Sequence, residues 1–212
     1  LDGLVGSEMC IRDRLSTFDL SKNSNYTGGE RFNKLSKKDG YRSRAAYKLK
    51  QINKSHNLIK QNQNILDIGC APGSWIQVVK ELTKGKASIT GIDILSMAKI
   101  EGITFLQKDL LEVNDNDLND HFDLVLSDIA PNISGISITD SENMIELLNI
   151  EIYLINKYLV KGGSFLAKCF QGSSFDHLKE FMKENFKEVV RIKPEASRTS
   201  SKECYLLGKF KK

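Results

Sequence analysis

The sequence predicts an α/β fold in which helices cover both faces of a mostly parallel, seven-stranded sheet. From residue 43 onward, short apolar runs alternate with segments of helical periodicity, an alternation typical of parallel sheets. The last two runs have no helix between them, which predicts an antiparallel final pair. The runs lie at residues 65–68, 88–92, 103–106, 122–126, 164–167, 189–192 and 204–207.

The segments between these runs carry apolar side chains at helical spacing. We expect Ser43 to cap a first helix, because a serine oxygen can accept from an exposed amide of the first turn. Further helices are expected after Gly73, over residues 143–159 and over residues 175–185. Together with the apolar runs, they predict one domain of ordinary size in this chain of 212 residues.

The first two dozen residues show no periodicity, and residues 15–40 are polar with two adjacent glycines at 28 and 29. They predict a poorly structured arm up to residue 40, ahead of a single domain at residues 41–212. Residues 8–14 look like the translation of a sequencing adapter. We therefore interpret residues 1–14 as an artefact of sequence assembly that carries no structural information.

Composition excludes several classes of protein and of site. No run of about 18 apolar residues is present, so we expect no membrane span. The start lacks the pattern of a signal peptide. The four cysteines form no C-x-x-C pair and no histidine cluster accompanies them, so neither a metal site nor a disulfide framework is expected. We expect a cytoplasmic protein.

The net charge of +4 hides a strong asymmetry along the chain. Residues 31–60 contain ten Lys and Arg against one acid, and residues 109–151 contain eleven acids and no Lys or Arg. Residues 152–212 contain thirteen basic and six acidic side chains. Two basic segments around an acidic middle favour a polyanionic partner, although a solvated mixed surface explains the same pattern.

A glycine-containing loop follows the first predicted strand in the sequence DIGCAPGSW, residues 67–75. Gly69 and Gly73 would let the backbone approach a ligand closely at the carboxyl end of that strand. The spacing differs from the dinucleotide pattern G-x-G-x-x-G. The loop therefore predicts a nucleoside-type ligand, with a tight turn as the alternative.

Three acids stand at the ends of the next predicted strands. Asp93 could accept from ribose hydroxyls, Asp109 from an adenine amino group, and Asp128 points into the same crevice. So many carboxylates suit a cationic ligand that carries a sulfonium beside an ammonium group, and do not suit a pyrophosphate.

Five sequence blocks in this order resemble the FtsJ/RrmJ (RlmE) family, ribose 2′-O-methyltransferases of large-subunit ribosomal RNA. They are YRSRAAYKL (41–49), DIGCAPGSW (67–75), SDIAPNISG (127–135), GGSFLAKCFQG (162–172), and the segment from KP (193–194) through SR (197–198) to SKE (201–203). The resemblance covers residues 40–208. Ahead of it, the aromatic-rich helix usual in the family is not recognisable in residues 26–38.

The resemblance implies a Rossmann-like class I methyltransferase fold and S-adenosyl-L-methionine as cofactor. It implies methylation of a uridine 2′-hydroxyl in the A loop of 23S ribosomal RNA, in support of ribosome assembly. Ribosomal RNA, within the large subunit, would be the partner of a monomeric enzyme. The family's catalytic tetrad falls on Lys48, Asp128, Lys168 and Glu203, and its cofactor contacts fall on Gly73, Trp75, Asp93, Asp109 and Asp128. Gly69 and Pro72 of the same glycine loop are further candidates for cofactor contact.

The residue types agree with this chemistry, but they leave the role of Lys168 open. A ribose hydroxyl needs a base that is neutral near pH 7, and a lysine can be neutral if burial and a nearby cation such as Lys48 lower its pKa. Asp128 and Glu203 would act in the opposite direction. Alternatively, a charged Lys168 stabilises the developing alkoxide while a carboxylate or water takes the proton.

Other readings remain open at this stage. Arg42, Arg44 and Arg198 are candidate RNA phosphate contacts or ordinary solvated side chains. The alternatives for function are a transfer RNA or messenger RNA cap 2′-O-methyltransferase, a small-molecule methyltransferase, and a non-catalytic RNA-binding assembly factor. Filled tetrad positions favour an enzyme, and basic flanks favour an RNA substrate.

Overall fold

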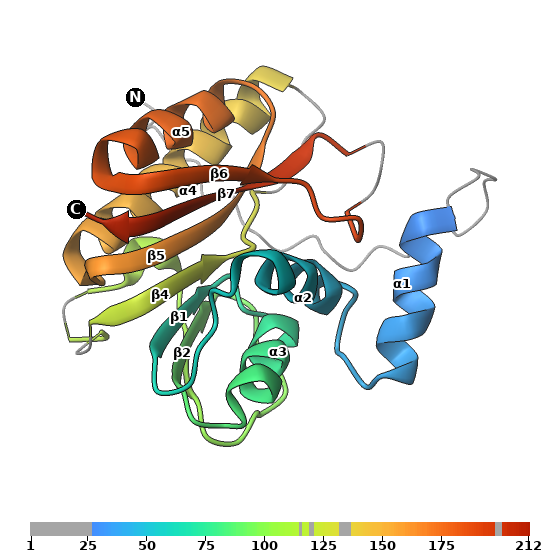
Figure 1. Ribbon diagram of the computed structural model, residues 1–212. Helices are drawn as coiled ribbons and strands as arrows, with labels where there is room; N and C mark the ends of the chain where they lie inside the picture. Colours follow the sequence, from blue (N-terminus) through green and yellow to red (C-terminus); the bar gives the residue numbers. More distant parts are fainter. Residues whose placement is uncertain (1–26, 115, 119–120, 132–136, 198–200) are drawn as a thin grey trace, which may run out of the picture.

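The computed structural model describes residues 27–114, 116–118, 121–131, 137–197 and 201–212, and these form a seven-stranded sheet between two layers of helices (Figure 1). The strand order is β3-β2-β1-β4-β5-β7-β6. Every neighbouring pair from β3 to β5 is parallel, and β7 is antiparallel to both β5 and β6. The strands are β1 Asn64–Ile68, β2 Ser88–Asp93, β3 Thr104–Gln107, β4 Phe122–Ser127, β5 Leu159–Phe170, β6 Phe186–Ile192 and β7 Glu203–Lys211. The predicted fold class and the antiparallel final pair are confirmed.

Helices α2 and α3 cover one face of the sheet, and α4 and α5 cover the other. A short 3₁₀ helix, η1, follows β3. The bounds are α1 Thr27–Lys38, α2 Ala45–His56, α3 Ser74–Thr83, η1 Leu110–Glu112, α4 Ser137–Tyr158 and α5 Ser173–Asn185. None of the described helices is long and apolar enough to cross a membrane.

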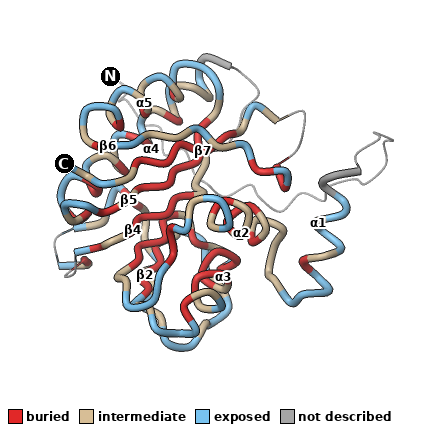
Figure 2. The backbone as a smooth tube through the Cα atoms, viewed as in Figure 1, coloured by how far each residue is buried: buried red, intermediate tan, exposed pale blue. Residues whose placement is uncertain are grey.

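The sheet separates two hydrophobic clusters because successive side chains of a strand point to opposite faces. On the α4 and α5 face, residues such as Met144, Leu178 and Phe165 pack together. On the α2 and α3 face, Leu49 and Val78 pack against side chains of the central strands. Figure 2 shows this pattern as buried positions along the sheet and the inner sides of the helices. The buried sheet holds the carboxyl ends of β1, β4 and β5 at one rigid edge.

Two expected boundaries differ from the structure. Helix α2 begins at Ala45, and Arg44 occupies the N-cap position without a side-chain cap, while Ser43 Oγ accepts a hydrogen bond from the Ala45 amide at 3.2 Å. Strand β5 is much longer than the predicted 164–167. Gly162, which the sequence places at the end of the preceding helix, instead lies within the strand with a φ of 80°.

The expectation of a poorly structured arm up to residue 40 is wrong for Thr27–Lys38, which forms helix α1. The helix contacts the domain through the ring of Phe32, whose centroid lies 5.3 Å from that of Tyr47 on α2. Few apolar residues mark α1 in the sequence, so its stability depends on this contact with α2. Residues 1–26, including the suspected adapter sequence, lie outside the described residues.

A charged residue, Glu151 of α4, is fully buried against the sheet. Its Oε1 accepts a hydrogen bond from Ser127 Oγ at the end of β4, whereas Oε2 has no hydrogen-bond partner among the described residues. Burial raises the pKa of this carboxyl to about 7, although the Ser127 hydrogen bond and the charge of Lys168 both lower it. Glu151 therefore changes charge in the folded protein near neutral pH.

We expect Glu151→Gln to stabilise the fold at pH 8. The wild-type carboxyl has a higher pKa in the folded than in the unfolded chain, so its favourable contribution is complete below about pH 4.5 and is lost as the pH rises through about 7. Glutamine keeps the acceptor for Ser127 without the charge. The gain in unfolding free energy should reach up to about 3 kcal/mol at pH 8 and shrink towards zero near pH 5. Denaturant unfolding at both pH values measures it.

The matched control is Glu146→Gln, at an exposed position of the same helix. Its effect should stay within about 0.5 kcal/mol at both pH values. Equal effects of the two substitutions would contradict the account given for Glu151.

Candidate active site

A cavity lies at the carboxyl end of β1, where the loop of residues 69–73 leads into α3. Its lining residues are Ser43, Ala45, Asp67, Gly69, Cys70, Ala71, Pro72, Ser74, Trp75 and Asp128. Gly69 has a φ of +72°, and a Cβ atom there would stand 2.8 Å from Ile129 Cβ. A side chain at this position would force apart the two loops that border the cavity. Gly69 therefore has a steric role between these loops, and its close approach to a ligand stays a prediction.

Arg42 holds this loop from outside. Its Nη1 donates to the carbonyl oxygens of Pro72 at 2.8 Å and Ala98 at 2.7 Å, and its Nη2 donates to that of Lys99 at 3.2 Å. A Cβ atom on Gly73 would lie only 3.0 Å from Arg42 Nη1. The guanidinium therefore fixes the protein backbone, and its contact with RNA phosphates stays a prediction.

Asp67 is not among the residues that the sequence predicts for the site, yet it lines the cavity. Its side chain is buried, and neither carboxylate oxygen has a hydrogen-bond partner among the described residues. Burial, together with the nearby charges of Asp128 and Asp93, raises the pKa of this carboxyl well above its usual value. The raised pKa favours the neutral acid, and a cation bound in the cavity would favour the ionised form by offsetting its desolvation. Its place in the D-x-G pattern is the sequence signal that could have identified it.

Asp93 and Asp109 lie further along the same edge of the sheet, at the ends of β2 and β3. Asp93 accepts hydrogen bonds from the Ala71 and Leu95 amides, each at 2.8 Å, and so anchors the loop to β2. Asp109 accepts from the Leu111 amide at 3.0 Å and caps η1. Both carboxylates are thereby oriented, and each oxygen keeps a lone pair for a further donor.

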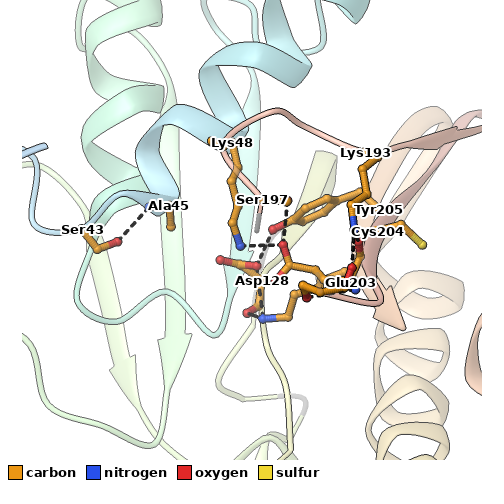
Figure 3. A network of polar contacts seen from close by, with 12 residues as sticks. Ser43, Ala45, Lys48, Asp128, Lys193, Ser197, Glu203, Cys204 and Tyr205 are labelled. Carbon is orange, nitrogen blue, oxygen red and sulfur yellow. Dashed lines mark hydrogen bonds and ion pairs between the residues drawn. The ribbon is translucent and has the colours of Figure 1, made fainter. Parts of the chain in front are cut away.

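The four predicted tetrad residues Lys48, Asp128, Lys168 and Glu203 meet beside the cavity, and we call them the polar cluster. Figure 3 labels Lys48, Asp128 and Glu203 of this cluster. They come from α2, the residue after β4, β5 and β7. Lys48 Nζ lies 2.7 Å from Glu203 Oε1, and the two side chains are 8% and 15% exposed. Lys168 Nζ lies 3.2 Å from Asp128 Oδ1 and also donates to the Asp128 carbonyl oxygen. Two ammonium groups thus face two carboxylates in a mostly buried space.

Tyr205 and Ser197 complete the cluster, although neither is predicted from the sequence. The Tyr205 hydroxyl donates to Asp128 Oδ1 at 2.7 Å, and Ser197 Oγ donates to Glu203 Oε1 at 2.9 Å. Burial, with the carboxylates of Asp128 and Glu203, raises the pKa of Tyr205 well above its usual value, so its hydroxyl remains a donor. Tyr205 follows Glu203 by two positions, and period-two alternation along a strand is the signal that places both on one face.

Aromatic side chains join the cavity to the polar cluster. The Trp75 ring centroid lies 5.9 Å from that of Tyr205, and Trp75 Nε1 donates to the Ala45 carbonyl at 2.9 Å. Lys48 Nζ stands 5.7 Å from the centre of the Tyr205 ring. Trp75, at 3% exposure, therefore packs between α2 and the sheet while one edge of it lines the cavity.

Arg44 and Arg198 are the other two predicted RNA contacts. Arg44 stands at the N-cap of α2, four residues ahead of Lys48. Arg198 lies outside the described residues, in the segment between β6 and β7. Both remain predictions. No group of three or more potential metal ligands occurs among the residues described.

Comparison with known proteins identifies the family of this chain. A family model described as FtsJ-like methyltransferase matches residues 41–211. The chain belongs to the FtsJ-like methyltransferase family. The match includes every member of the polar cluster and every residue that lines the cavity.

Curated relatives of this FtsJ-like methyltransferase carry the name ribosomal RNA large subunit methyltransferase E. The protein from Herminiimonas arsenicoxydans is 42% identical over 188 residues, which are 83% of this chain and 88% of that protein. The protein from Neisseria meningitidis serogroup B is 39% identical over 213 residues, covering 96% of this chain and 100% of that protein.

Solved structures agree with the fold. A structure described as a ribosomal RNA methyltransferase from Plasmodium falciparum is 36% identical, with a TM-score of 0.74, and the match covers 81% of this chain and 98% of that chain. Fibrillarin from Methanococcus jannaschii, at 16% identity and a TM-score of 0.54, shares the fold over 73% of this chain and 69% of its own.

We expect Arg42→Ala to loosen the loop of this methyltransferase. The change removes three hydrogen bonds from a charged donor to backbone carbonyls, so the unfolding free energy should fall by about 2 kcal/mol. Hydrogen exchange in residues 69–75 should accelerate. Denaturant unfolding and exchange mass spectrometry measure the two effects.

Lys99→Ala is the control, because the Lys99–Glu101 ion pair is 81% exposed on both sides. It should leave stability within about 0.5 kcal/mol and exchange in the loop unchanged. An Arg42→Ala protein with wild-type loop exchange would show that the guanidinium does not hold the loop.

Proposed function

We propose that this chain transfers a methyl group from S-adenosyl-L-methionine to a ribose 2′-hydroxyl, on a uridine in the A loop of 23S ribosomal RNA. The observation that carries the proposal is the convergence of Lys48, Asp128, Lys168 and Glu203 beside a cavity walled by an unpaired buried carboxylate. The ribosomal RNA substrate is supported by the printed names of the relatives at about 40% identity.

The residues at the edge of the sheet fit this cofactor. Asp128 supplies negative charge for the cationic methionine part, and Asp67 would ionise as that cation binds beside it, while Asp93 and Asp109 are oriented acceptors for the ribose and adenine. Gly69, Pro72 and Gly73 bring the backbone close, and Trp75 closes the cavity wall. When bound, the cofactor supplies a methyl group on a sulfonium, which makes that carbon electrophilic.

Lys168 is the group that handles the hydroxyl proton in this proposal. Its ammonium is held by the Asp128 carboxylate and by the Asp128 carbonyl oxygen, so Nζ has a fixed position. The Asp128 carboxylate also accepts from Tyr205, and a cationic ligand beside it would share its charge further. In the proposed role, Nζ takes the proton from the ribose hydroxyl at this fixed position.

Lys48 and Glu203 set the electrostatics around Lys168. Glu203 is engaged by Lys48 and by Ser197, so its negative charge acts less on Lys168 than that of a free carboxylate. Lys48 adds positive charge, which stabilises an alkoxide that forms beside the cluster. The alternative, a permanently charged Lys168 that stabilises the oxyanion, uses the same geometry.

The direct test is to incubate the protein with labelled cofactor and large ribosomal subunits from a cell that lacks this modification. Digestion and mass spectrometry should locate one 2′-O-methyluridine in the A loop. Naked 23S RNA in a parallel reaction separates an RNA substrate from an assembled subunit. Methylation on a base, on transfer RNA or on a cap would overturn the proposed acceptor.

We expect Lys168→Ala and Lys168→Met to reduce methyl transfer by at least about a hundredfold, because each removes the group that handles the proton. Cofactor affinity should change less than about threefold, as measured by calorimetry. In contrast, Asp93→Ala should weaken cofactor binding by roughly 1–3 kcal/mol through loss of a half-buried charged acceptor. Circular dichroism verifies that each variant is folded. Wild-type transfer by either Lys168 variant would refute its assigned role.

RNA binding should depend strongly on salt, because basic side chains around the acceptor site would displace counterions from phosphates. Arg44→Ala and Arg198→Ala should each weaken RNA binding and reduce the slope of log affinity against log salt by about one unit. Cofactor affinity should be unchanged. Fluorescence anisotropy with an A-loop RNA measures the slopes.

Lys86→Ala is the matched control, since Lys86 is exposed just ahead of β2, at the opposite edge of the sheet. It should keep the wild-type slope. The same slope in all three variants would mean that neither arginine contacts a phosphate.

A further inference from the structure

Two cysteines face each other across the strands that carry Lys168 and Glu203. Cys169 of β5 and Cys204 of β7 are register partners in the antiparallel pair. Their Sγ atoms lie 3.6 Å apart, and both thiols are buried on the α4 and α5 face. The polar cluster does not use either thiol.

The positions allow a covalent bond without a change of fold. Directly opposed residues of antiparallel strands have Cα atoms roughly 4.5–5.5 Å apart, within the roughly 4.4–6.8 Å range of disulfides. The sulfurs need to approach only from 3.6 Å to about 2.05 Å. We infer that Cys169 and Cys204 form a dithiol oxidation site, which hydroperoxides convert to a disulfide that lowers the activity of the adjacent polar cluster.

The electrostatics select one of the two sulfurs as the nucleophile. The Cys169 thiol, through its hydrogen bond, and the positive charge of Arg191 on β6 lower the pKa of Cys204. The same contact with Cys204, together with burial, raises the pKa of Cys169. Cys204 is therefore the thiolate of the pair, and thiolates are the form that reacts.

The reaction balances with a hydroperoxide as the oxidant. Cys204 Sγ attacks one peroxide oxygen, the O–O bond breaks, and a sulfenic acid and one water (an alcohol, for an organic hydroperoxide) result. Cys169 Sγ then attacks the sulfenyl sulfur, the S–S bond forms, the S–O bond breaks, and a water leaves with the Cys169 proton. The two thiols together lose two electrons, and the peroxide gains them. A dithiol reductant reverses the change by exchange.

The consequence for the polar cluster follows from strand geometry. Cys169 adjoins Lys168 and Cys204 adjoins Glu203, with each pair of neighbours on opposite faces of its strand. Drawing the sulfurs together on one face moves the backbone that carries the two charged groups on the other. Displacements of about 1 Å at a reacting centre can cost about a hundredfold in rate. This part of the inference rests on the proposed function, whereas the disulfide itself does not.

The test treats the full chain with hydrogen peroxide, blocks remaining thiols, and maps the digest by mass spectrometry. We expect a peptide pair joined through Cys169 and Cys204, lighter by two hydrogen atoms than the reduced pair. Methyl transfer should fall about tenfold or more and return after dithiothreitol. Oxidation should be slow, because the thiols are buried and α5 must open locally.

Cys169→Val and Cys204→Val are the controls, because valine fills a similar apolar space. Both should keep the activity of the reduced protein and lose its peroxide sensitivity. Cys70→Ala should still form the cross-link; burial raises the pKa of Cys70, which keeps that thiol protonated. Absence of the cross-link in wild type, or its presence with unchanged transfer, would overturn the inference. A reduced protein without any transfer would instead count against the proposed function, while the mapped cross-link would still decide the dithiol site.

Discussion

The arrangement of this protein depends on one constraint: charges taken out of water must be neutralised where they are buried. The Lys48–Glu203 and Lys168–Asp128 pairs satisfy it inside the polar cluster, and their polar neighbours Tyr205 and Ser197 occupy further lone pairs. Each pair joins elements that are distant in sequence, so removing one partner leaves an uncompensated charge in a closed space. The same arrangement that fixes α2 against the sheet thus gathers the groups to which we assign the chemistry.

Asp67 is the place where this neutralisation is left incomplete. Its carboxylate is buried as deeply as the core residues around it, yet neither oxygen has a hydrogen-bond partner among the described residues. Asp93 and Arg42 hold the neighbouring loop in place. The polar groups that hold the cavity loop have hydrogen-bond partners, whereas Asp67 on the cavity wall has none among the described residues. A bound cation would therefore interact most strongly with the wall that Asp67 forms.

The sequence predicts most of the fold, because hydrophobic periodicity determines strand and helix types and their alternation determines the sheet. The sequence does not predict contacts between segments that are distant along the chain. Helix α1 is held by the tilted ring contact of Phe32 with Tyr47, and Arg42 donates to backbone carbonyls, which no side-chain pattern indicates. The tetrad positions came from matched motifs, and their meeting in space depends on the register between β5 and β7. Strand alternation places Tyr205 on the same face as Glu203, whereas no sequence pattern indicates that Glu151 contacts Ser127.

The reversed direction of β7 has a consequence for how the protein is made. Parallel strands deliver their last residues to the functional edge, but β7 delivers its first, Glu203, because it runs the other way. Helix α2 and the glycine loop leave the ribosome early during translation, so a nascent chain can shape the cavity while Lys48 still lacks its carboxylate. The pairing of Lys48 waits for β7 to be synthesised and inserted between β5 and β6. Completion of the sheet and completion of the charge balance are thus a single late event in biosynthesis.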